Sequence, residues 1–403
     1  MSQKFEAKYG LPEDVRFCTR CVMSNQRPAS SVEFKHTTSH THTTLRMDER
    51  GVCDACTVSA RKENIDWKER ERELIDLLAQ YRRRDGGYDV LVPGSGGKDS
   101  VYASHVLKYR YGMHPLTVTW APHLYTEVGW KNFQSWLHRG GFDNYLFTPN
   151  GRAHRTLTRL AFENLLHPFQ PFILGQKNFP PRFAAEHGIP LVFYGESEAE
   201  YGNPRGEINT ARRDSTYFAQ RPEELDQLHL GGVALRDLVK YDIQPEDLRP
   251  YFPMEPELMD KAKLDVRYLG YYLKWVPQEC YYYAVEHIGF EAGPERTPGT
   301  YSKYNSIDDK IDDFHYYTTW IKFGIGRATY DASQEIRNGH ITREEGVALV
   351  RRYDGEFPER YFSEFLEYIG ISRDRFWEIV DGFRSPHLWK WTPKGWQLRH
   401  RVE

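Results

Sequence analysis

The stretch Tyr88–Ser100, with the sequence YDVLVPGSGGKDS, constrains the fold of this chain more than any other. The apolar run 88–92 predicts a strand, which is followed by small residues and a polar helix start. Gly94, Gly96 and Gly97 lack a Cβ, so backbone N–H groups can turn towards an anion and approach it closely. The following helix points its positive end at the same place. The stretch therefore predicts a strand, a phosphate-binding loop and a helix.

The polar side chains of this loop favour a pyrophosphate group as its ligand. Ser95 and Ser100 add hydroxyls, and Lys98 adds a mobile positive charge. The P-loop of NTPases requires Ser or Thr directly after the lysine, and Asp99 stands there instead, so this is a different phosphate loop. Asp99 is a candidate magnesium ligand, although it would also stabilise the helix N-terminus without binding a metal.

The string SGGKDS at Ser95–Ser100 resembles the signature of the PP-loop ATP pyrophosphatases. These enzymes split ATP between the α and β phosphates and adenylate a carbonyl oxygen. The alternative is an ordinary glycine-rich turn before a helix, but the strand, glycines, lysine and helix occur in the required order. The resemblance implies that ATP with Mg²⁺ is held by Ser95, Gly96, Gly97, Lys98, Asp99 and Ser100.

Strand patterns alternate with helix patterns on both sides of this loop. Strands are expected at 88–92, 115–120, 144–147 and 190–194, and helices at 64–84, 99–109, 127–139, 153–166 and 181–187. Such alternation predicts an α/β fold, a parallel sheet flanked by helices with right-handed crossovers. Ligands of these sheets bind at the carboxyl ends of the strands. Trp120, Gly195 and Glu196 should therefore join the phosphate loop in one crevice.

Three carboxylates, Glu196, Glu198 and Glu200, follow the last of these strands. Magnesium bound to a pyrophosphate needs carboxylates or water as its remaining ligands, which makes Glu196 a candidate catalytic residue. The alternative is a solvated acidic loop, and it suits Glu198 and Glu200 better than it suits Glu196.

Four of the five cysteines form two C-x-x-C pairs near the start of the chain: Cys18 with Cys21, and Cys53 with Cys56. Four thiolates in two such pairs are typical of a closed, structural zinc site. Two disulfides or an iron–sulfur cluster would also use four cysteines. We favour Zn²⁺ and expect the polar tract His36–His42 between the pairs to be an exposed loop without ligands.

Composition limits the class of protein. The chain has 403 residues and a mean hydropathy of -0.71, and it contains no long apolar run, so we expect no membrane span. Since no signal-peptide core follows Met1, we expect a cytoplasmic protein. A net charge of -3 gives no overall field that would attract tRNA or another nucleic acid. The 27 tyrosines suit a sugar-binding groove, but core and interface positions explain them better.

The C-terminal half has helical periodicity, with a capping-box spacing at Thr342–Glu345 and a helix start at Ser372. We therefore expect three parts: a zinc ribbon at 1–63, the α/β domain at 64–230 and a helical domain for substrate or partner at 231–403. Trp389, Trp391 and Trp396 near the end of the chain are candidate docking anchors.

Several segments together resemble one branch of the PP-loop (HUP-like) group, the bacterial N-acetyl sugar amidotransferases. Besides the phosphate loop these are Phe17–Met23, Cys53–Cys56, Pro171–Asn178, Tyr194–Gly202 and Lys322–Thr329. The family usually carries Asn where Ser197 stands here. This is a mild departure from the family's motif at the position next to Glu196, a residue to which the motif assigns a role. Members of this family make acetamidino sugars for surface polysaccharides such as O-antigen lipopolysaccharide and for nonulosonic acids.

The resemblance implies an ATP-dependent amidine synthesis. The acetamido oxygen of the sugar attacks the α-phosphorus, pyrophosphate leaves, and ammonia then displaces AMP from the O-adenylyl imidate. Lys322 and Arg327 flank two glycines and are expected to close on the phosphates, although a surface helix end explains them equally well.

The nitrogen is expected to come from a separate glutaminase. A glutaminase needs a nucleophilic cysteine at the mature N-terminus or on a glycine-flanked elbow, and neither Ser2 nor Cys280 provides one. The family resemblance also suggests a separate partner of this kind.

Two other functions fit part of the pattern. A tRNA-modifying PP-loop enzyme of the thiolase type would need active-site cysteines and a basic face, but only Cys280 lies outside the proposed zinc site. A non-catalytic zinc-dependent interaction module would leave the phosphate loop unexplained.

Overall fold

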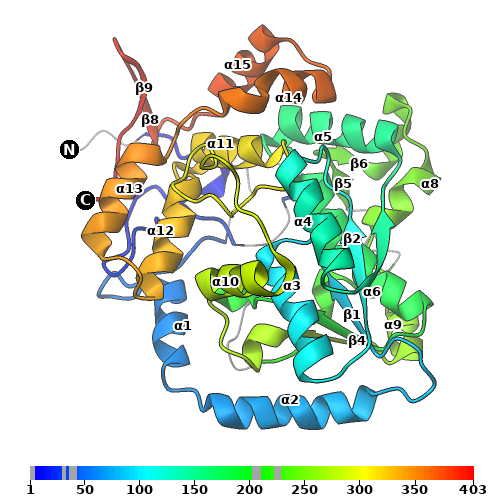
Figure 1. The fold of residues 1–403 in the computed structure, drawn as a ribbon. Helices are drawn as coiled ribbons and strands as arrows, with labels where there is room; N and C mark the ends of the chain where they lie inside the picture. Colours follow the sequence, from blue (N-terminus) through cyan, green and yellow to red (C-terminus); the bar gives the residue numbers. More distant parts are fainter. Residues whose placement is uncertain (1–4, 30–32, 36–42, 202–209, 222–227) are drawn as a thin grey trace.

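A parallel sheet lies at the centre of the computed structural model, which describes residues 5–29, 33–35, 43–201, 210–221 and 228–403. The strand order is β3-β2-β1-β4-β7, and every neighbouring pair is parallel. Figure 1 labels β1, β2 and β4 of this sheet. The strands are β1 (Val90–Pro93), β2 (Pro115–Trp120), β3 (Asp143–Phe147), β4 (Leu191–Tyr194) and β7 (Asp265–Tyr268). The predicted α/β class is confirmed, and β7 adds a strand from beyond the predicted boundary at residue 230.

Both faces of the sheet are covered by helices because β1 alternates its side chains between them. Val90 and Val92 pack with α2 (Trp67–Tyr81) and α3 (Lys98–His105), whereas Leu91 packs with α6 (Gln170–Glu186) on the other face. All three strand residues are almost completely buried. Burial on both faces explains why this strand is a continuous apolar run.

The order of the connections determines where a ligand can bind. Helix α3 links β1 to β2, and α4 (Glu127–His138) links β2 to β3. The chain then passes through α5 (Gly151–Leu165) and α6 to β4, which pairs with the opposite edge of β1. The carboxyl ends of β1 and β4 therefore flank a topological switch point, the usual ligand crevice of open parallel sheets.

The C-terminal region is mainly helical, as predicted. Its helices are α10 (Pro277–Ile288), α11 (Asp312–Phe323), α12 (Arg327–Arg337), α13 (Arg343–Tyr353), α14 (Phe362–Ile369) and α15 (Arg373–Gly382). The capping box at the start of α13 forms, and Ser372 caps α15. The sequence did not indicate the hairpin of β8 (Trp389–Thr392) and β9 (Gly395–Leu398) that carries the three tryptophans.

Short elements fill the segment between β4 and α10. Among the described residues they include β5 (His229–Leu230), β6 (Val233–Ala234), α8 (Pro245–Leu248) and α9 (Pro256–Ala262), together with several 3-10 turns. Helix α1 (Asp54–Lys62) follows the second cysteine pair near the start of the chain. Among the residues described, no helix is both long and apolar enough to cross a membrane.

One aromatic core joins the α/β region to the C-terminal helices. Phe162 on α5 stacks on Phe376 of α15 with ring centroids 5.3 Å apart, and Phe314 of α11 stacks on Phe365 of α14 at 4.2 Å. All four rings are fully buried in one cluster. The two regions therefore pack as one body, which positions the C-terminal helices over the carboxyl edge of the sheet.

A buried carboxylate in this core makes stability depend on pH. Burial raises the pKa of Asp313 to about 7, and its Oδ2 lies 3.5 Å from Nη2 of Arg360. The folded state then binds more protons than the unfolded state between about pH 4 and about pH 7, so stability falls as pH rises through this window. The contribution is at most about 4 kcal/mol.

We expect Asp313→Asn to lose less stability than the unchanged protein when the pH rises from about 5 to about 8. Urea unfolding at both pH values measures the difference. Asp374→Asn, at an exposed position of α15, is the matched control and should leave the pH dependence as it was. An unaltered pH slope in Asp313→Asn would contradict the assignment.

Candidate functional site

The phosphate loop has the backbone shape that its glycines predict. Gly96 has φ +83°, and a Cβ there would lie 2.8 Å from the Cα of Phe133. A Cβ on Gly94 would lie 2.1 Å from the Cβ of Ser100. Helix α3 begins at Lys98, directly after Gly97, and no side chain caps its N-terminus. The first N–H groups of α3 therefore remain available to an anion.

Lys98 and Asp99 form an ion pair at the start of α3. Nζ of Lys98 lies 2.7 Å from Oδ2 of Asp99, and the indole of Trp275 donates to Oδ1 of the same carboxylate at 3.0 Å. Burial alone would lower the pKa of Lys98, but the charge of Asp99 and its hydrogen bond outweigh burial, so the pKa is raised. Lys98 is therefore a fixed positive charge at the loop.

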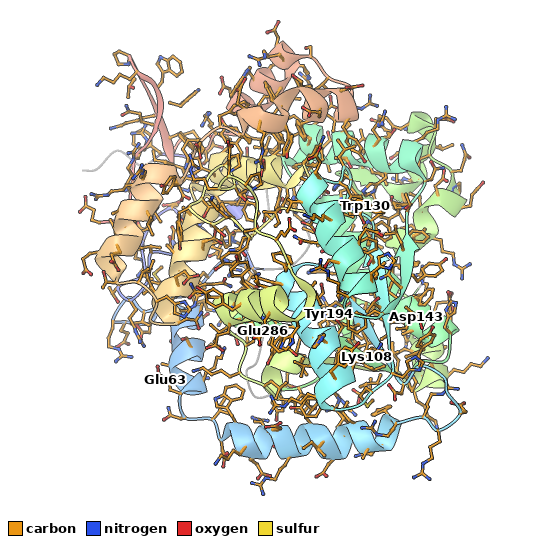
Figure 2. The ribbon with its side chains drawn as sticks, viewed as in Figure 1. Glu63, Lys108, Trp130, Asp143, Tyr194 and Glu286 are labelled. Carbon is orange, nitrogen blue, oxygen red and sulfur yellow. The ribbon has the colours of Figure 1, made fainter. Side chains whose placement is uncertain are left out.

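Glu196 follows β4 on the other side of the switch point. Burial, and next the charge of Asp99, raise its pKa to about 7. The hydroxyl of Tyr201 donates to its Oε1 at 3.4 Å. In Figure 2 Tyr194, the last residue of β4, is labelled near the middle of the molecule. The charges of Asp99 and Glu196 are therefore close enough to repel each other.

Two carboxylates that repel in this way fit a divalent cation. Asp99 and Glu196 supply hard oxygen donors, which Mg²⁺ prefers, beside a loop suited to phosphate groups. Glu200, another of the predicted carboxylates, does not join them. Glu200 forms an ion pair with Lys62 of α1 at 2.6 Å, which is a structural contact. The side chain of Glu198, Gly202 and the tract His36–His42 lie outside the part that is described.

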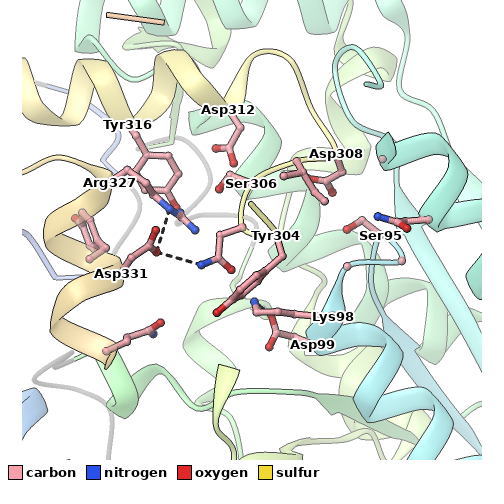
Figure 3. Close-up of a pocket in the computed structure, with 18 of the residues that line it drawn as sticks. Ser95, Lys98, Asp99, Tyr304, Ser306, Asp308, Asp312, Tyr316, Arg327 and Asp331 are labelled. Atoms are coloured by element: carbon pink, nitrogen blue, oxygen red, sulfur yellow. Dashed lines mark hydrogen bonds and ion pairs between the residues drawn. The ribbon is translucent and has the colours of Figure 1, made fainter. Parts of the chain in front are cut away.

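Two cavities meet at the phosphate loop. The first has a volume of about 430 Å³ and lies between the loop and the C-terminal helices (Figure 3). The second, of about 330 Å³, lies over the carboxyl ends of the strands. Ser95, Gly97, Asp99 and Tyr201 line both. A ligand as long as a nucleotide therefore has room on either side of the loop.

Most of the predicted site residues line these two cavities. Gly96, Lys98 and Arg327 line the first, and Ser100, Trp120, Gly195 and Glu196 line the second. Figure 3 shows Lys98 and Asp99 on one side of the first cavity and Arg327 with Asp331 on another. Ser95 and Asp331 are far apart in the sequence but line the same cavity.

Lys322 lies elsewhere, which differs from the prediction that it joins Arg327 on the phosphates. It lines a neighbouring cavity of about 290 Å³, where its Nζ lies 2.5 Å from Glu33 and donates to the carbonyl of Leu165 at 2.8 Å. The reason is the end of α11 at Gly324, which has φ +69° and separates Lys322 from α12. The two cations are therefore on different helices and face different cavities.

Sequence reasoning missed the acidic wall of the first cavity. Asp308 accepts a hydrogen bond from Ser95 of the phosphate loop, and burial raises its pKa. Burial likewise raises the pKa of Asp312 to about 7. In Figure 3 both point towards the space above the loop. The sequence SIDDKIDD looks like a solvated acidic stretch, so no local signal distinguishes these two aspartates.

The four cysteines form a separate candidate metal site. Their ligand atoms all lie within 4.8 Å of one another, with Sγ–Sγ distances of 3.9 Å for Cys18 to Cys56 and 3.7 Å for Cys21 to Cys53. Four thiolates at about 2.3 Å from a tetrahedral ion would be roughly 3.8 Å apart, so the arrangement fits a metal ion. All four are buried and free of disulfide bonds.

The cysteine module, residues 5–29 and 43–62, packs on the C-terminal region. Its cysteines share a cluster with Phe323, Ile325, Leu388 and Trp389. Arg343 of α13 donates to the carbonyl oxygens of Cys21 and Cys18 at 3.2 and 3.3 Å. The module therefore docks against the C-terminal helices and the β8–β9 hairpin, which gives buried Trp389 the docking role considered for it.

Comparisons with known proteins give a partial match. Residues 298–403 match the family model described as LPS biosynthesis protein WbpG-like, C-terminal domain. That segment contains the acidic wall, Arg327 and the surface on which the cysteine module docks. No curated protein matches the chain. Among solved structures, NMN synthetase from Francisella tularensis matches at 12% identity and a TM-score of 0.27, covering 62% of this chain and 93% of that one.

Proposed function

We propose that this protein is an AMP-forming, ATP-dependent amidotransferase that converts the acetamido group of a bacterial sugar into an acetamidino group. The observation that carries the proposal is the phosphate loop with Lys98, open on both sides to cavities large enough for a nucleotide and a sugar. The match of residues 298–403 to an LPS biosynthesis family model supports a sugar of a surface polysaccharide as the acceptor. The carboxyl, hydroxyl and aromatic groups of the first cavity suit a sugar ring.

The first half-reaction is adenylation. The acetamido oxygen attacks the α-phosphorus of ATP, the bond between that phosphorus and the bridging oxygen breaks, and pyrophosphate leaves. The amide N–H proton is lost as the O-adenylyl imidate forms. Loop N–H groups and Lys98 stabilise the charge that develops on the departing pyrophosphate. Mg²⁺, held by Asp99 and Glu196, would supply further charge stabilisation on the phosphates.

The second half-reaction is nitrogen transfer. Ammonia adds to the imidate carbon, a proton is lost, and the C–O bond to AMP breaks to leave the amidine. The carboxylates of Asp308 and Asp312 line the cavity in which this step would occur. Adenylation is needed because an amide oxygen is a poor leaving group, whereas AMP is a good one.

We further propose that the ammonia comes from a separate glutaminase. Cys280, which lies outside the cysteine cluster, is 2% exposed, and burial, together with the charge of Asp99, raises its pKa well above the usual value. A buried neutral thiol is a poor nucleophile. The same property argues against a thiolation enzyme that acts on tRNA.

The cysteine cluster would hold a structural Zn²⁺. Four thiolates complete the tetrahedral coordination of the ion and leave no open ligand position.

The decisive experiment is to measure AMP and pyrophosphate release with ATP, Mg²⁺ and ammonium against a panel of N-acetylated bacterial sugars. We expect one acceptor class to give stoichiometric AMP, pyrophosphate and amidine. Release of ADP and phosphate instead would contradict the cleavage position. Glutamine hydrolysis by the purified chain alone would contradict the separate nitrogen source.

A further inference from the structure

Arg27 is the most unusual charged residue in the first cavity. It belongs to the cysteine module, six residues after Cys21, and is 5% exposed. Its side chain lines both the cavity that faces the phosphate loop and the neighbouring cavity around Lys322. No motif or periodicity in the sequence singles it out.

The charge of Arg27 has no carboxylate partner in the part of the chain that is described. The hydroxyl of Tyr330 is its hydrogen-bond partner, and the ring of the same tyrosine lies 5.6 Å from Cζ. Its Nη1 is buried without any hydrogen bond. Burial lowers its pKa, and the nearby charge of Arg337 lowers it further. The folded chain therefore keeps an uncompensated guanidinium at the wall of a cavity.

Two partly buried arginines nearby, Arg327 and Arg337, differ from Arg27 in this respect. Arg327 has Nε 3.2 Å from Oδ1 of Asp331. Nη2 of Arg337 donates to the carbonyl oxygen of Glu200 at 3.4 Å. Each of these two cations therefore has a partner within the protein. Among the described residues no carboxylate balances Arg27, so a bound anion is the simplest source of its missing charge and hydrogen bond.

We propose that Arg27 binds an anionic oxygen group, a phosphate or a carboxylate, of the ligand that occupies the cavity facing the phosphate loop. The guanidinium fork matches both groups with two parallel N–H donors. The anion belongs either to a phosphate of the nucleotide or to an acidic group on the acceptor, and the acceptor case rests on the proposed function. In both cases the cysteine module contributes directly to ligand binding.

The test uses Arg27→Met and Arg27→Lys in the full chain, with Arg16→Gln as control. Arg16 is an exposed arginine of the same module and lines none of these cavities. The probes are ATP with Mg²⁺, inorganic pyrophosphate, UDP-N-acetylglucosamine, N-acetylneuraminic acid and uncharged N-acetylglucosamine. Calorimetry gives their affinities, and thermal unfolding gives the stability of each ligand-free variant.

We expect Arg27→Met to bind at least one anionic probe about 10- to 100-fold more weakly, because a charge-assisted hydrogen bond is lost. Uncharged N-acetylglucosamine should bind as before. Weaker binding of ATP and pyrophosphate would identify a nucleotide phosphate, and weaker binding of an acidic sugar alone would identify the acceptor. The ligand-free Arg27→Met protein should be as stable as the unchanged protein or more stable, since an uncompensated charge has been removed.

If Arg27→Met does not fold, Arg27→Lys carries the test. Lysine keeps the positive charge but lacks the two parallel N–H donors of the guanidinium group. The affinity of this variant for the same anionic probe should be lower by at least about fivefold. Unchanged affinity of the folded variants for every probe would overturn the proposal, whatever their stability. These measurements need no turnover, so loss of ATP binding in Arg27→Met would support the proposal even if no sugar gave AMP.

Discussion

Lys98→Ala should lower the rate of AMP formation by about 10²- to 10³-fold while the protein stays folded. Lys98 is the first residue of the helix that follows the loop, and it also balances Asp99, whose carboxylate lies 2.7 Å from its Nζ. Without Lys98 the departing pyrophosphate loses one stabilising charge. The repulsion between Asp99 and Glu196 is also no longer offset, because the positive charge that acts on both carboxylates is gone.

The measurement is AMP release in single turnover, with circular dichroism to verify the fold. Lys68→Ala, at an exposed position in the first turn of α2, is the control and should stay within about twofold of the unchanged rate. A folded Lys98→Ala protein that keeps its rate would remove this residue from the mechanism. A fall in ATP affinity without a fall in the single-turnover rate would assign Lys98 to binding alone.

The phosphate loop could be predicted from sequence because all its determinants are local. Gly94 and Gly96 leave room for a tight turn, and Lys98 starts the next helix. The alternating strands were also visible, because a strand that is buried on both faces is a continuous apolar run. The class of the fold therefore followed from short windows of sequence.

Helix α6 shows where a local rule misled the prediction. The helix was expected only over 181–187, and proline usually starts or breaks a helix. The observed helix runs from Gln170 to Glu186 with Pro180 and Pro181 inside it. Both prolines are buried, and the hydroxyl of Tyr194 on β4 donates to the carbonyl of Gln176 at 3.5 Å. Tertiary packing and this donor compensate for the missing N–H groups.

The rest of the site depends on contacts between distant segments. Asp308 reaches Ser95, and Arg27 shares a cavity with both. Neither residue stands out by periodicity or motif. Lys322 was placed with Arg327 because the two are close in sequence, but the turn at Gly324 sends them to different cavities. Sequence proximity was therefore a poor guide to position once a helix ended between the two residues.

The proposed metal site at the four cysteines would link the stability of the module to ligand binding. The module is small, and its buried cysteines share a cluster with Leu388 and Trp389 of the C-terminal region. A small module of this kind depends on its metal to fold, with apparent binding free energies of about 10 to 16 kcal/mol for zinc peptides. Metal loss should therefore expose the docking surface and also displace Arg27 from the first cavity.

We expect Cys56→Ser to lose the bound metal and to unfold at a much lower temperature than the unchanged protein, or to be insoluble. Treatment of the unchanged protein with a strong chelator should give the same result and release about one equivalent of zinc.

Cys280→Ser is the matched control. It also replaces a buried thiol, but one outside the cluster, so it should retain the metal and lose only about 1 to 3 kcal/mol of stability. Native mass spectrometry and thermal unfolding measure both effects. A Cys56→Ser protein as stable as Cys280→Ser, or a purified chain without metal that resists unfolding, would show that the four thiols pack as an ordinary core.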